Sequence, residues 1–302
     1  MAQGGKTALG WAARDASGHL SPYSFSRREQ RDGDVTIEVL FCGICHTDLH
    51  VMKNEWGNAM YPVIPGHEVV GTVTDVGGGV SKFKVGDTVG VGYFVDSCRH
   101  CESCTKGQES YCPDLVQASN GATTQGGFSD VLVVSQDYVV RVPESLPPAG
   151  AAPLLCAGVT VYSPMVEYGL NAPGKHLGVM KAAASTMDGV IDTVSAGHPV
   201  APLLELLKPR GLLVVVGIPS KPLEVPALAI VGGGKRVVGS GGGGVAKCQE
   251  MLDFAREHGI TADIEVVGMD YVNKAIQRLE KNDVRYRFVA DVAGSMRAVL
   301  LN

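Results

Sequence analysis

Residues 174–184 have the sequence Gly-Lys-His-Leu-Gly-Val-Met-Lys-Ala-Ala-Ala, and they decide how the second half of the chain can fold. The first six residues are typical of a turn followed by the first strand of a nucleotide-binding sheet. Such a strand normally leads into a G-x-G-x-x-G loop at a helix start, where backbone N–H groups and the helix dipole bind a pyrophosphate. Here Met180 follows at once, so the sequence predicts a sheet without this loop.

Beyond Pro153, continuous apolar strands alternate with helices, which is typical of a parallel sheet covered on both faces. The strands are expected at 189–194, 212–216 and 236–240, with a helix over 203–209 that ends at Pro209. Further along we expect helices at 246–258 and 271–279 and a last strand at 287–292.

The missing stretch should also have held the second and third strands of the sheet. In the strand order 3-2-1-4-5-6 these two form an outer edge, so the remaining strands would still be neighbours. However, nine residues separate Val179 from Gly189, and a parallel crossover needs a dozen or more. We therefore expect the first strand to be mispaired or to leave an exposed edge. The glycine-rich stretch 232–244 surrounds the expected strand at 236–240, so it matches a pyrophosphate-binding loop only superficially.

Residues 35–142 have a different composition, which is rich in valine and in glycine-containing turns. Strand patterns recur at 69–76, 84–91 and 131–134. Short strands at close spacing with glycine turns predict a compact β-barrel. The fold class expected for the whole chain is therefore α/β, a barrel domain joined to a truncated parallel sheet.

Composition limits the function classes. With 302 residues the chain can form two domains, and 45% hydrophobic with 19% charged residues is typical of a globular protein. A net charge of −5 without a basic cluster argues against nucleic acid or an anionic membrane as partner. The longest apolar run, 211–219, is too short to cross a bilayer. Eight cysteines without an export signal favour metal ligands or buried thiols in the cytosol.

Four of these cysteines have the spacing C-x2-C-x2-C-x7-C, which is the strongest chemical signal in the chain. A structural zinc site is tetrahedral and often all-thiolate, and two-residue spacers let one loop surround the ion. An iron–sulfur cluster uses similar spacings, and unpaired surface cysteines are a further alternative. A closed four-cysteine site has no open position, so it would stabilise a loop without catalysing a reaction. The four residues are Cys98, Cys101, Cys104 and Cys112.

A looser set contains Cys45, His67 and Cys156, with Glu68 next to His67. Two cysteines and one histidine are a known ligand set of catalytic zinc, with a fourth position open for water or alcohol. Because these residues lie far apart in sequence, spacing alone is weak support, and both cysteines could be buried structural thiols.

The motifs that hold these residues are arranged in the same order as in one enzyme family. The segments 43–48 (Gly-Ile-Cys-His-Thr-Asp), 65–68 (Pro-Gly-His-Glu), the cysteine lobe and 155–160 (Leu-Cys-Ala-Gly-Val-Thr) resemble the medium-chain zinc alcohol dehydrogenases. Segments 7–15, 157–164, 269–273 and 283–288 narrow the resemblance to the plant cinnamyl alcohol dehydrogenases over nearly the whole chain.

The resemblance implies an NADP-dependent enzyme, usually dimeric, that interconverts hydroxycinnamaldehydes and their alcohols for lignin and phenylpropanoid synthesis. It implies a GroES-like barrel domain of residues 1–156 and 246–302 with two zinc ions, and a truncated Rossmann domain of residues 157–245. The expected partners are a small aldehyde or alcohol and a second copy of the chain, in the cytoplasm.

The resemblance also assigns roles to single residues. Cys45, His67 and Cys156 would hold the catalytic zinc, and Glu68 could enter its shell. Asp48 would orient His67. Thr47 would hydrogen-bond the alcohol, and His50 would pass its proton to solvent; an ordinary barrel-surface histidine is the alternative for His50. Thr47 would also contact the cofactor, together with Thr160, Thr193, Gly217, Ser240, Gly241 and Gly242.

Two departures from the family pattern bear on activity. The missing loop and 2′-phosphate residues predict impaired NADP binding, and Gln117 stands where the family has an aromatic side chain in a longer loop. The alternatives are a catalytically inactive zinc-binding variant that acts as a dimer partner, or a product of aberrant splicing without a stable fold.

Overall fold

The computed structural model describes residues 5–119, 124–177 and 184–299, and its chain divides into two compact units. Residues 1–158 and 244–302 form the first unit, and residues 159–243 form the second. The Val179–Met180 junction lies outside the described residues.

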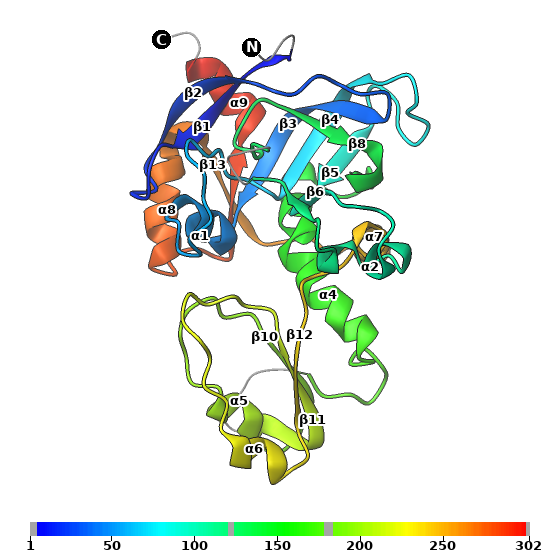
Figure 1. The fold of residues 1–302 in the computed structure, drawn as a ribbon, viewed down its shortest axis with the longest axis vertical. Coiled ribbons are helices and arrows are strands. Elements are labelled where there is room, and N and C mark those ends of the chain that lie inside the picture. Colours follow the sequence, from blue (N-terminus) through cyan, green and yellow to red (C-terminus); the bar gives the residue numbers. More distant parts are fainter. Residues whose placement is uncertain (1–4, 120–123, 178–183, 300–302) are drawn as a thin grey trace. The chain divides into compact units, whose positions relative to one another are not determined.

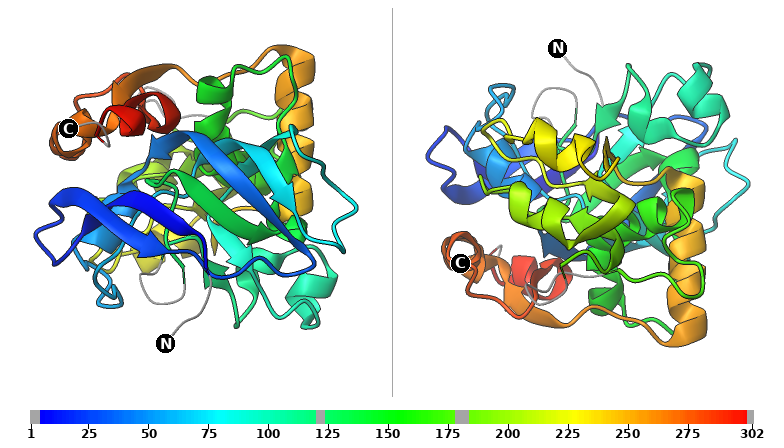
Figure 2. Two further views of the ribbon diagram at one scale, coloured as in Figure 1. Left: turned by 90° about the horizontal axis from the view of Figure 1, so that it is seen from above. Right: turned by 90° about the horizontal axis from the view of Figure 1, so that it is seen from below.

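The first unit is built on a seven-stranded sheet with the order β13-β14-β3-β4-β5-β9, in which β8 also pairs with β3 (Figure 1). The strands are β3 (Asp34–Ile44), β4 (Val69–Val76), β5 (Thr88–Val91), β8 (Val131–Ser135), β9 (Val140–Arg141), β13 (Ile264–Gly268) and β14 (Arg287–Asp291). The long strand β3 pairs antiparallel with β4, β8 and β14, so the sheet curls around it (Figure 2). This arrangement confirms the predicted barrel.

Two smaller strand pairs complete this unit. β1 (Thr7–Ala13) pairs with β2 (Leu20–Ser26), and β6 (Phe94–Asp96) pairs with β7 (Val116–Gln117). Alternating valine and isoleucine side chains of β3, β4 and β5 are almost fully buried and form the barrel core with Trp11, Phe128 and Phe288. The predicted strand at 84–91 begins only at Thr88, because Lys84–Asp87 form a turn.

Helices and short helical turns of the first unit lie between and after these strands. They are α1 (His46–Met52), α2 (Glu102–Thr105), η1 (Glu109–Tyr111), η2 (Gln136–Tyr138), α3 (Pro148–Ala151), η3 (Ala152–Leu155), α7 (Val245–His258), η4 (Met269–Tyr271), α8 (Val272–Glu280) and α9 (Val292–Val299). α4 (Ala157–Glu167) begins in the first unit and continues into the second.

The second unit contains a parallel sheet with the order β10-β11-β12, as the sequence predicts. Its strands are β10 (Met187–Asp192), β11 (Leu207–Val215) and β12 (Arg236–Gly239), and its helices are α5 (Ala201–Leu206) and α6 (Ala227–Val231). Leucines and valines of α5, β10 and β11 form a core on one face, and Leu170, Leu212 and Val214 form a core on the other. Leu177 makes a single parallel bridge with Gly189, so the described end of the expected first strand lies beside β10.

The helix predicted over 203–209 is wrong at its end. α5 ends at Leu206, and Lys208 and Pro209 belong to β11. A residue that precedes proline is disfavoured in the helical conformation, so the chain leaves the helix before Lys208.

Within the described residues, no single helix is long and apolar enough to cross a membrane. The segments Pro148–Leu155 and Ala157–Glu167 pass that test only as a pair, which is bent by 53°.

Candidate metal centres and cofactor site

The four-cysteine lobe forms one compact cluster in the structure. All eight cysteines are free thiols, and the Sγ atoms of Cys98, Cys101, Cys104 and Cys112 lie within 4.8 Å of one another. Backbone N–H groups point at these sulfur atoms: Cys101 N lies 3.3 Å from Cys98 Sγ, and Cys104 N lies 3.5 Å from Cys101 Sγ. Such N–H donors stabilise thiolates, and they hold the loop around the sulfur atoms.

The lobe has the dimensions of a tetrahedral zinc site. Cys98 Sγ and Cys104 Sγ are 3.9 Å apart. Zinc–sulfur bonds of about 2.3 Å in a tetrahedron place two sulfur atoms about 3.8 Å apart. The residues present therefore fit a closed structural zinc.

The second cluster brings together residues that are more than a hundred positions apart in sequence. Cys45 follows β3 at the start of α1, His67 and Glu68 precede β4, and Cys156 follows η3. The ligand atoms of these four residues lie within 4.8 Å of one another. His67 is fully buried, and its Nε2 has no hydrogen-bond partner among the described residues. Buried polar atoms normally have a hydrogen-bond partner, so a buried nitrogen without one beside two thiols is typical of a metal ligand. This cluster therefore also fits a zinc ion.

Asp48 is the residue that fixes the geometry of this cluster. Its buried carboxylate accepts hydrogen bonds from His67 Nδ1 at 2.9 Å, Gly66 N at 2.8 Å and Cys45 N at 2.9 Å. The bond to Cys45 N belongs to a capping box at the start of α1. With Nδ1–H donated to Asp48, the Nε2 lone pair of His67 is left for a ligand.

Charge in the second cluster is balanced by Arg287, which the sequence analysis did not single out as a site residue. Its Nη2 lies 2.7 Å from Glu68 Oε1 and 3.6 Å from Cys45 Sγ. The hydrogen bond from Cys156, with the charges of Arg287 and His67, holds the pKa of Cys45 well below its usual range despite burial. Burial raises the pKa of Glu68 to about 8, although Arg287 opposes this. Arg287 lies 242 positions from Cys45 in sequence, and only the family motif at 283–288 could have indicated it.

Thr47 and His50 lie one turn apart on α1, so their side chains share a face of the helix. His50 is buried; its Nδ1 lies 2.7 Å from Glu55 Oε2, and its ring packs 5.0 Å from that of Trp56. The Nε2 of His50 has no partner among the described residues. Glu55 is a second residue that sequence reasoning missed, and its position five residues after His50 was the signal available. The side chain of His50 is therefore not exposed on the barrel surface, and its proton-transfer role stays a prediction.

The candidate cofactor residues of the second unit gather at the carboxyl ends of its strands. Thr193 follows β10, Gly217 follows β11, and Ser240 follows β12. Ser240 N donates to Val215 O at 3.0 Å, and a Cβ on Gly217 would lie 2.2 Å from Val194 O. Carboxyl ends of parallel strands are where α/β sheets bind ligands. Thr160 lies beside Gly242: a Cβ atom placed on this glycine would be 3.6 Å from Thr160 Oγ1. Gly241 is exposed between them.

The pattern G-x-G-x-x-G occurs once in the chain, at 239–244, between β12 and α7. A Cβ on Gly244 would lie 2.1 Å from Gly107 O and 2.2 Å from Glu109 Oε2. The start of α7 therefore faces a carbonyl and a carboxylate, which would repel a phosphate. This supports the interpretation that the glycine run matches a pyrophosphate loop only superficially.

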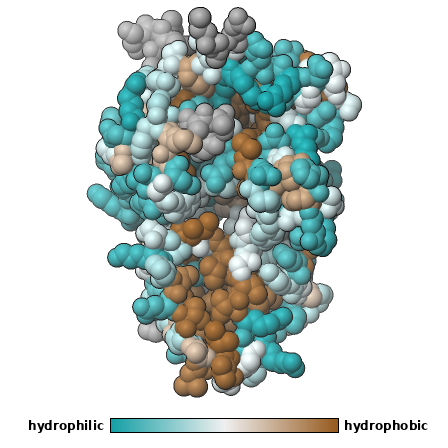
Figure 3. All heavy atoms as spheres, viewed as in Figure 1, coloured by the Kyte–Doolittle hydropathy of each residue, from teal (hydrophilic) through white to brown (hydrophobic). Residues whose placement is uncertain are grey.

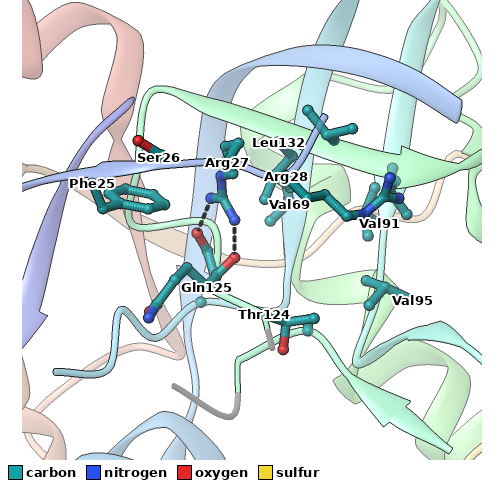
Figure 4. Close-up of a pocket in the computed structure, with 15 residues that line it drawn as sticks. Phe25, Ser26, Arg27, Arg28, Val69, Val91, Val95, Thr124, Gln125 and Leu132 are labelled. Atoms are coloured by element: carbon teal, nitrogen blue, oxygen red, sulfur yellow. Dashed lines mark hydrogen bonds between the residues drawn. The ribbon is translucent and has the colours of Figure 1, made fainter. Parts of the chain in front are cut away.

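A small cavity of about 70 Å³ lies in the first unit beside the buried Arg27 (Figure 4). Arg27 donates to Val131 O at 2.8 Å, Gly126 O at 2.9 Å and Ser129 Oγ at 2.6 Å, and also to Gln125 O. Burial lowers the pKa of Arg27 to about 9. Because its donors are occupied by the segment 125–131, we assign Arg27 a structural role in holding that segment.

Comparison with known proteins identifies the family of the chain. Residues 31–144 match the family model of the alcohol dehydrogenase GroES-like domain, and residues 170–257 match that of the zinc-binding dehydrogenase. A probable cinnamyl alcohol dehydrogenase of rice, Oryza sativa subsp. japonica, is 64% identical over 354 positions that cover 99% of this chain and 98% of the relative. The chain belongs to the zinc-dependent cinnamyl alcohol dehydrogenase family.

Two solved structures of cinnamyl alcohol dehydrogenases have the same fold. That from Sorghum bicolor has a TM-score of 0.94 with 67% identity, and covers 96% of this chain and 99% of its own. That from Helicobacter pylori, complexed with NADP(H), has a TM-score of 0.92 with 30% identity, and covers 97% and 100%. Members of the family act on small alcohols and aldehydes, and the comparisons give no support to the alternative of an inactive variant.

The alignment with the rice cinnamyl alcohol dehydrogenase also shows that this chain is shortened internally. It has 354 positions, whereas this chain has 302 residues, so at least 52 positions stand opposite gaps in this chain. Both chains are nonetheless covered almost from end to end. This agrees with the prediction of a missing internal stretch.

Proposed function

We propose that this chain is a zinc- and NADP-dependent oxidoreductase that interconverts hydroxycinnamaldehydes and hydroxycinnamyl alcohols. The observation that carries the proposal is the cluster of Cys45, His67, Glu68 and Cys156, whose ligand atoms lie within 4.8 Å. The family names of the relatives support the substrate class, and the H. pylori relative is complexed with NADP(H).

Two zinc ions per chain are proposed. Cys45, His67 and Cys156 would hold the catalytic ion, with Glu68 able to join them, and Cys98, Cys101, Cys104 and Cys112 would hold the structural ion. When bound, zinc supplies Lewis-acid polarisation of the substrate oxygen, and NADP(H) supplies the hydride acceptor or donor.

The protein side chains handle the proton of the reaction. Thr47 lies on the same face of α1 as His50 and would hold the substrate hydroxyl by a hydrogen bond. His50 would take the proton at its unpartnered Nε2, and the Glu55 carboxylate, 2.7 Å from Nδ1, would stabilise the resulting imidazolium. In aldehyde reduction the same residues would return the proton to the substrate oxygen, which then becomes the hydroxyl of the alcohol. Asp48 holds His67 in one tautomer throughout.

For the cofactor we propose Thr47 in the first unit and Thr160, Thr193, Gly217, Ser240, Gly241 and Gly242 in the second. The support is their position at the carboxyl edge of the parallel sheet and the buried Ser240 Oγ, which has no hydrogen-bond partner in the part of the chain that the structure describes. We likewise propose that residues 1–156 and 246–302 form the catalytic domain and residues 157–245 form the nucleotide-binding domain. The division of the chain into compact units supports these bounds to within two residues.

A homodimer is proposed through the second unit. β12 is the last strand of its sheet in the described chain, and a two-fold copy would satisfy that edge. Apolar side chains gather over this unit (Figure 3), among them Leu228, 81% exposed, and Val231, 77% exposed, on α6. We propose that the dimer works in the cytoplasm, where reducing conditions keep the eight thiols free.

Elemental analysis and an aldehyde-reduction assay test the proposal together. We expect two zinc ions per purified chain, and consumption of NADPH with coniferaldehyde at high cofactor concentration. The variant Cys45→Ser should lose one zinc ion and all turnover. One zinc ion or none in the parent chain would refute the proposed metal centres, and turnover retained by Cys45→Ser would refute the proposed catalytic site.

A further inference from the structure

A buried carboxylate organises the end of β10 in the second unit. Asp192 is 3% exposed, and its backbone oxygen accepts hydrogen bonds from Val216 N at 2.9 Å and Gly217 N at 3.0 Å. Its Oδ1 accepts a bond from Val194 N at 3.1 Å. Asp192 therefore joins the last residues of β10 and β11 to the turn that follows β10.

The remaining carboxylate oxygen of Asp192 faces His198. His198 Nε2 lies 2.9 Å from Asp192 Oδ2, and His198 Nδ1 lies 2.9 Å from Ala196 O. Both partners are acceptors only, because one is a carboxylate and the other a carbonyl. A neutral imidazole has one N–H and can satisfy one of the two, whereas an imidazolium satisfies both. The contacts therefore require the protonated form of His198.

We propose that His198 is a positioning residue, whose imidazolium holds the turn at residues 193–198 in the conformation that receives NADP(H). This rests on the proposed function, because Thr193 in this turn is one of the proposed cofactor residues. The position of the turn is tightly set, since a Cβ on Gly217 would lie 2.2 Å from Val194 O. Movement of Val194 would therefore disturb Thr193 and Gly217 together.

The charges around His198 are few. Apart from His198, residues 193–200 carry no charged side chain, and neither do residues 214–217 at and just after the end of β11. Adjoining segments carry Glu205 on α5 and Lys221 after β11. The hydrogen bond to Ala196 O and the charge of Asp192 raise the pKa of His198 above its usual 6.5, against partial desolvation.

The sign of the pH dependence follows from this direction. Both folded and unfolded forms carry the proton below pH 6.5, and the hold on the turn is lost as pH rises through the raised pKa of the folded protein. Since only the ordered turn receives the cofactor, NADPH affinity should fall about five- to tenfold between pH 7 and pH 9.5. The 2′-phosphate of NADPH is already ionised in this window.

The first test follows the histidine itself, without cofactor. Protein labelled with ¹³C in its histidine rings is titrated by NMR, and the signal of His198 is assigned by its absence in His198→Gln. This signal should give a pKa above 6.5. Asp192→Asn should lower that pKa. A pKa of His198 at or below 6.5, or one unchanged by Asp192→Asn, would overturn the proposal.

The second test measures NADPH affinity by fluorescence titration at pH 7 and pH 9.5. NADPH affinity should fall with rising pH in the parent chain and in His176→Gln, the matched control. His176 belongs to the same unit; its side chain is exposed, and its bonds to Asp188 are made by its backbone. In His198→Gln the affinity should be as low at both pH values as that of the parent at pH 9.5. In His198→Arg, which stays charged, it should be as high at both pH values as that of the parent at pH 7. A purely structural role would not give the rescue by arginine. Equal pH dependence in all four chains would refute the positioning role. Absence of NADPH binding at either pH would refute the proposed cofactor site, and the histidine pKa would still decide the state of His198.

Discussion

Replacing Asp48 by asparagine tests how the proposed catalytic zinc site is held. The carboxylate of Asp48 accepts three hydrogen bonds, two at Oδ1, from His67 and Gly66, and one at Oδ2, from Cys45 N. An asparagine can keep the first two with its amide oxygen. Its NH₂ group would then face Cys45 N–H, so one bond is lost and a buried donor is left without an acceptor.

The magnitude follows from that one position. A hydrogen bond to a charged group contributes about 1.5–3 kcal/mol, and a stranded buried donor costs about 1–3 kcal/mol. Because the two effects overlap, Asp48→Asn should lower the free energy of unfolding by about 2–4 kcal/mol. The ligand His67 also loses its anionic partner, so zinc affinity at this site should fall about 10- to 100-fold.

Zinc content after dialysis against a chelator and unfolding in urea measure the two effects separately. We expect the variant to retain one zinc ion per chain under conditions in which the parent retains two. Asp34→Asn is the matched control, because Asp34 is a buried carboxylate of the same barrel that bonds Arg28 and Arg31 N instead of a metal ligand. It should lose stability and keep both zinc ions. Two retained ions in Asp48→Asn, with chelator resistance equal to the parent, would refute the reasoning.

The other predictions concern the lobe, the Glu68 contact, the dimer and the cofactor. Cys104→Ser should destabilise the four-cysteine lobe, seen as a lower melting temperature, whereas Cys45→Ser should mainly remove one zinc ion; equal melting temperatures would contradict this. Gly43→Ala should cost about 1–3 kcal/mol in urea unfolding, since its Cβ would lie 1.8 Å from Glu68 Oε2; Gly33→Ala, with nothing within 4 Å of its Cβ, should be nearly neutral. Light scattering at micromolar concentration should show a dimer, and a clean monomer would count against the β12 interface. NADPH should bind weakly, because losing three charge-assisted bonds of about 1.5–3 kcal/mol each reduces affinity by a factor on the order of a thousand or more; micromolar binding with turnover of roughly one per second would show that the remaining sheet suffices.

The barrel and the four-cysteine lobe could be predicted from sequence alone, because their signals are local. Spacing alone indicates the four-cysteine lobe, and glycine turns between short valine-rich strands indicate the barrel. The second cluster needed the family motifs, since Cys45 and Cys156 are brought together only by the fold. Arg287 and Glu55 were missed as site residues because a lone arginine or glutamate has no pattern of its own. The predicted helix ran to Pro209, whereas α5 ends at Leu206. The prediction overlooked that the residue before a proline is itself disfavoured in the helical conformation.

In the proposed function, the parallel sheet of the second unit would position the reacting end of the cofactor. β10, β11 and β12 keep the parallel order of a complete sheet, and their carboxyl ends bring Thr193, Gly217 and Ser240 to one edge. The lost loop would have supplied affinity through the pyrophosphate, which is remote from the hydride. Affinity and geometry are therefore separable in this chain. A cofactor concentration high enough to offset the lost contacts should therefore restore turnover. The family reaction is consequently expected with a greatly raised KM for NADPH, and a kcat that vanishes even at saturation would mean that the loop also orients the nicotinamide.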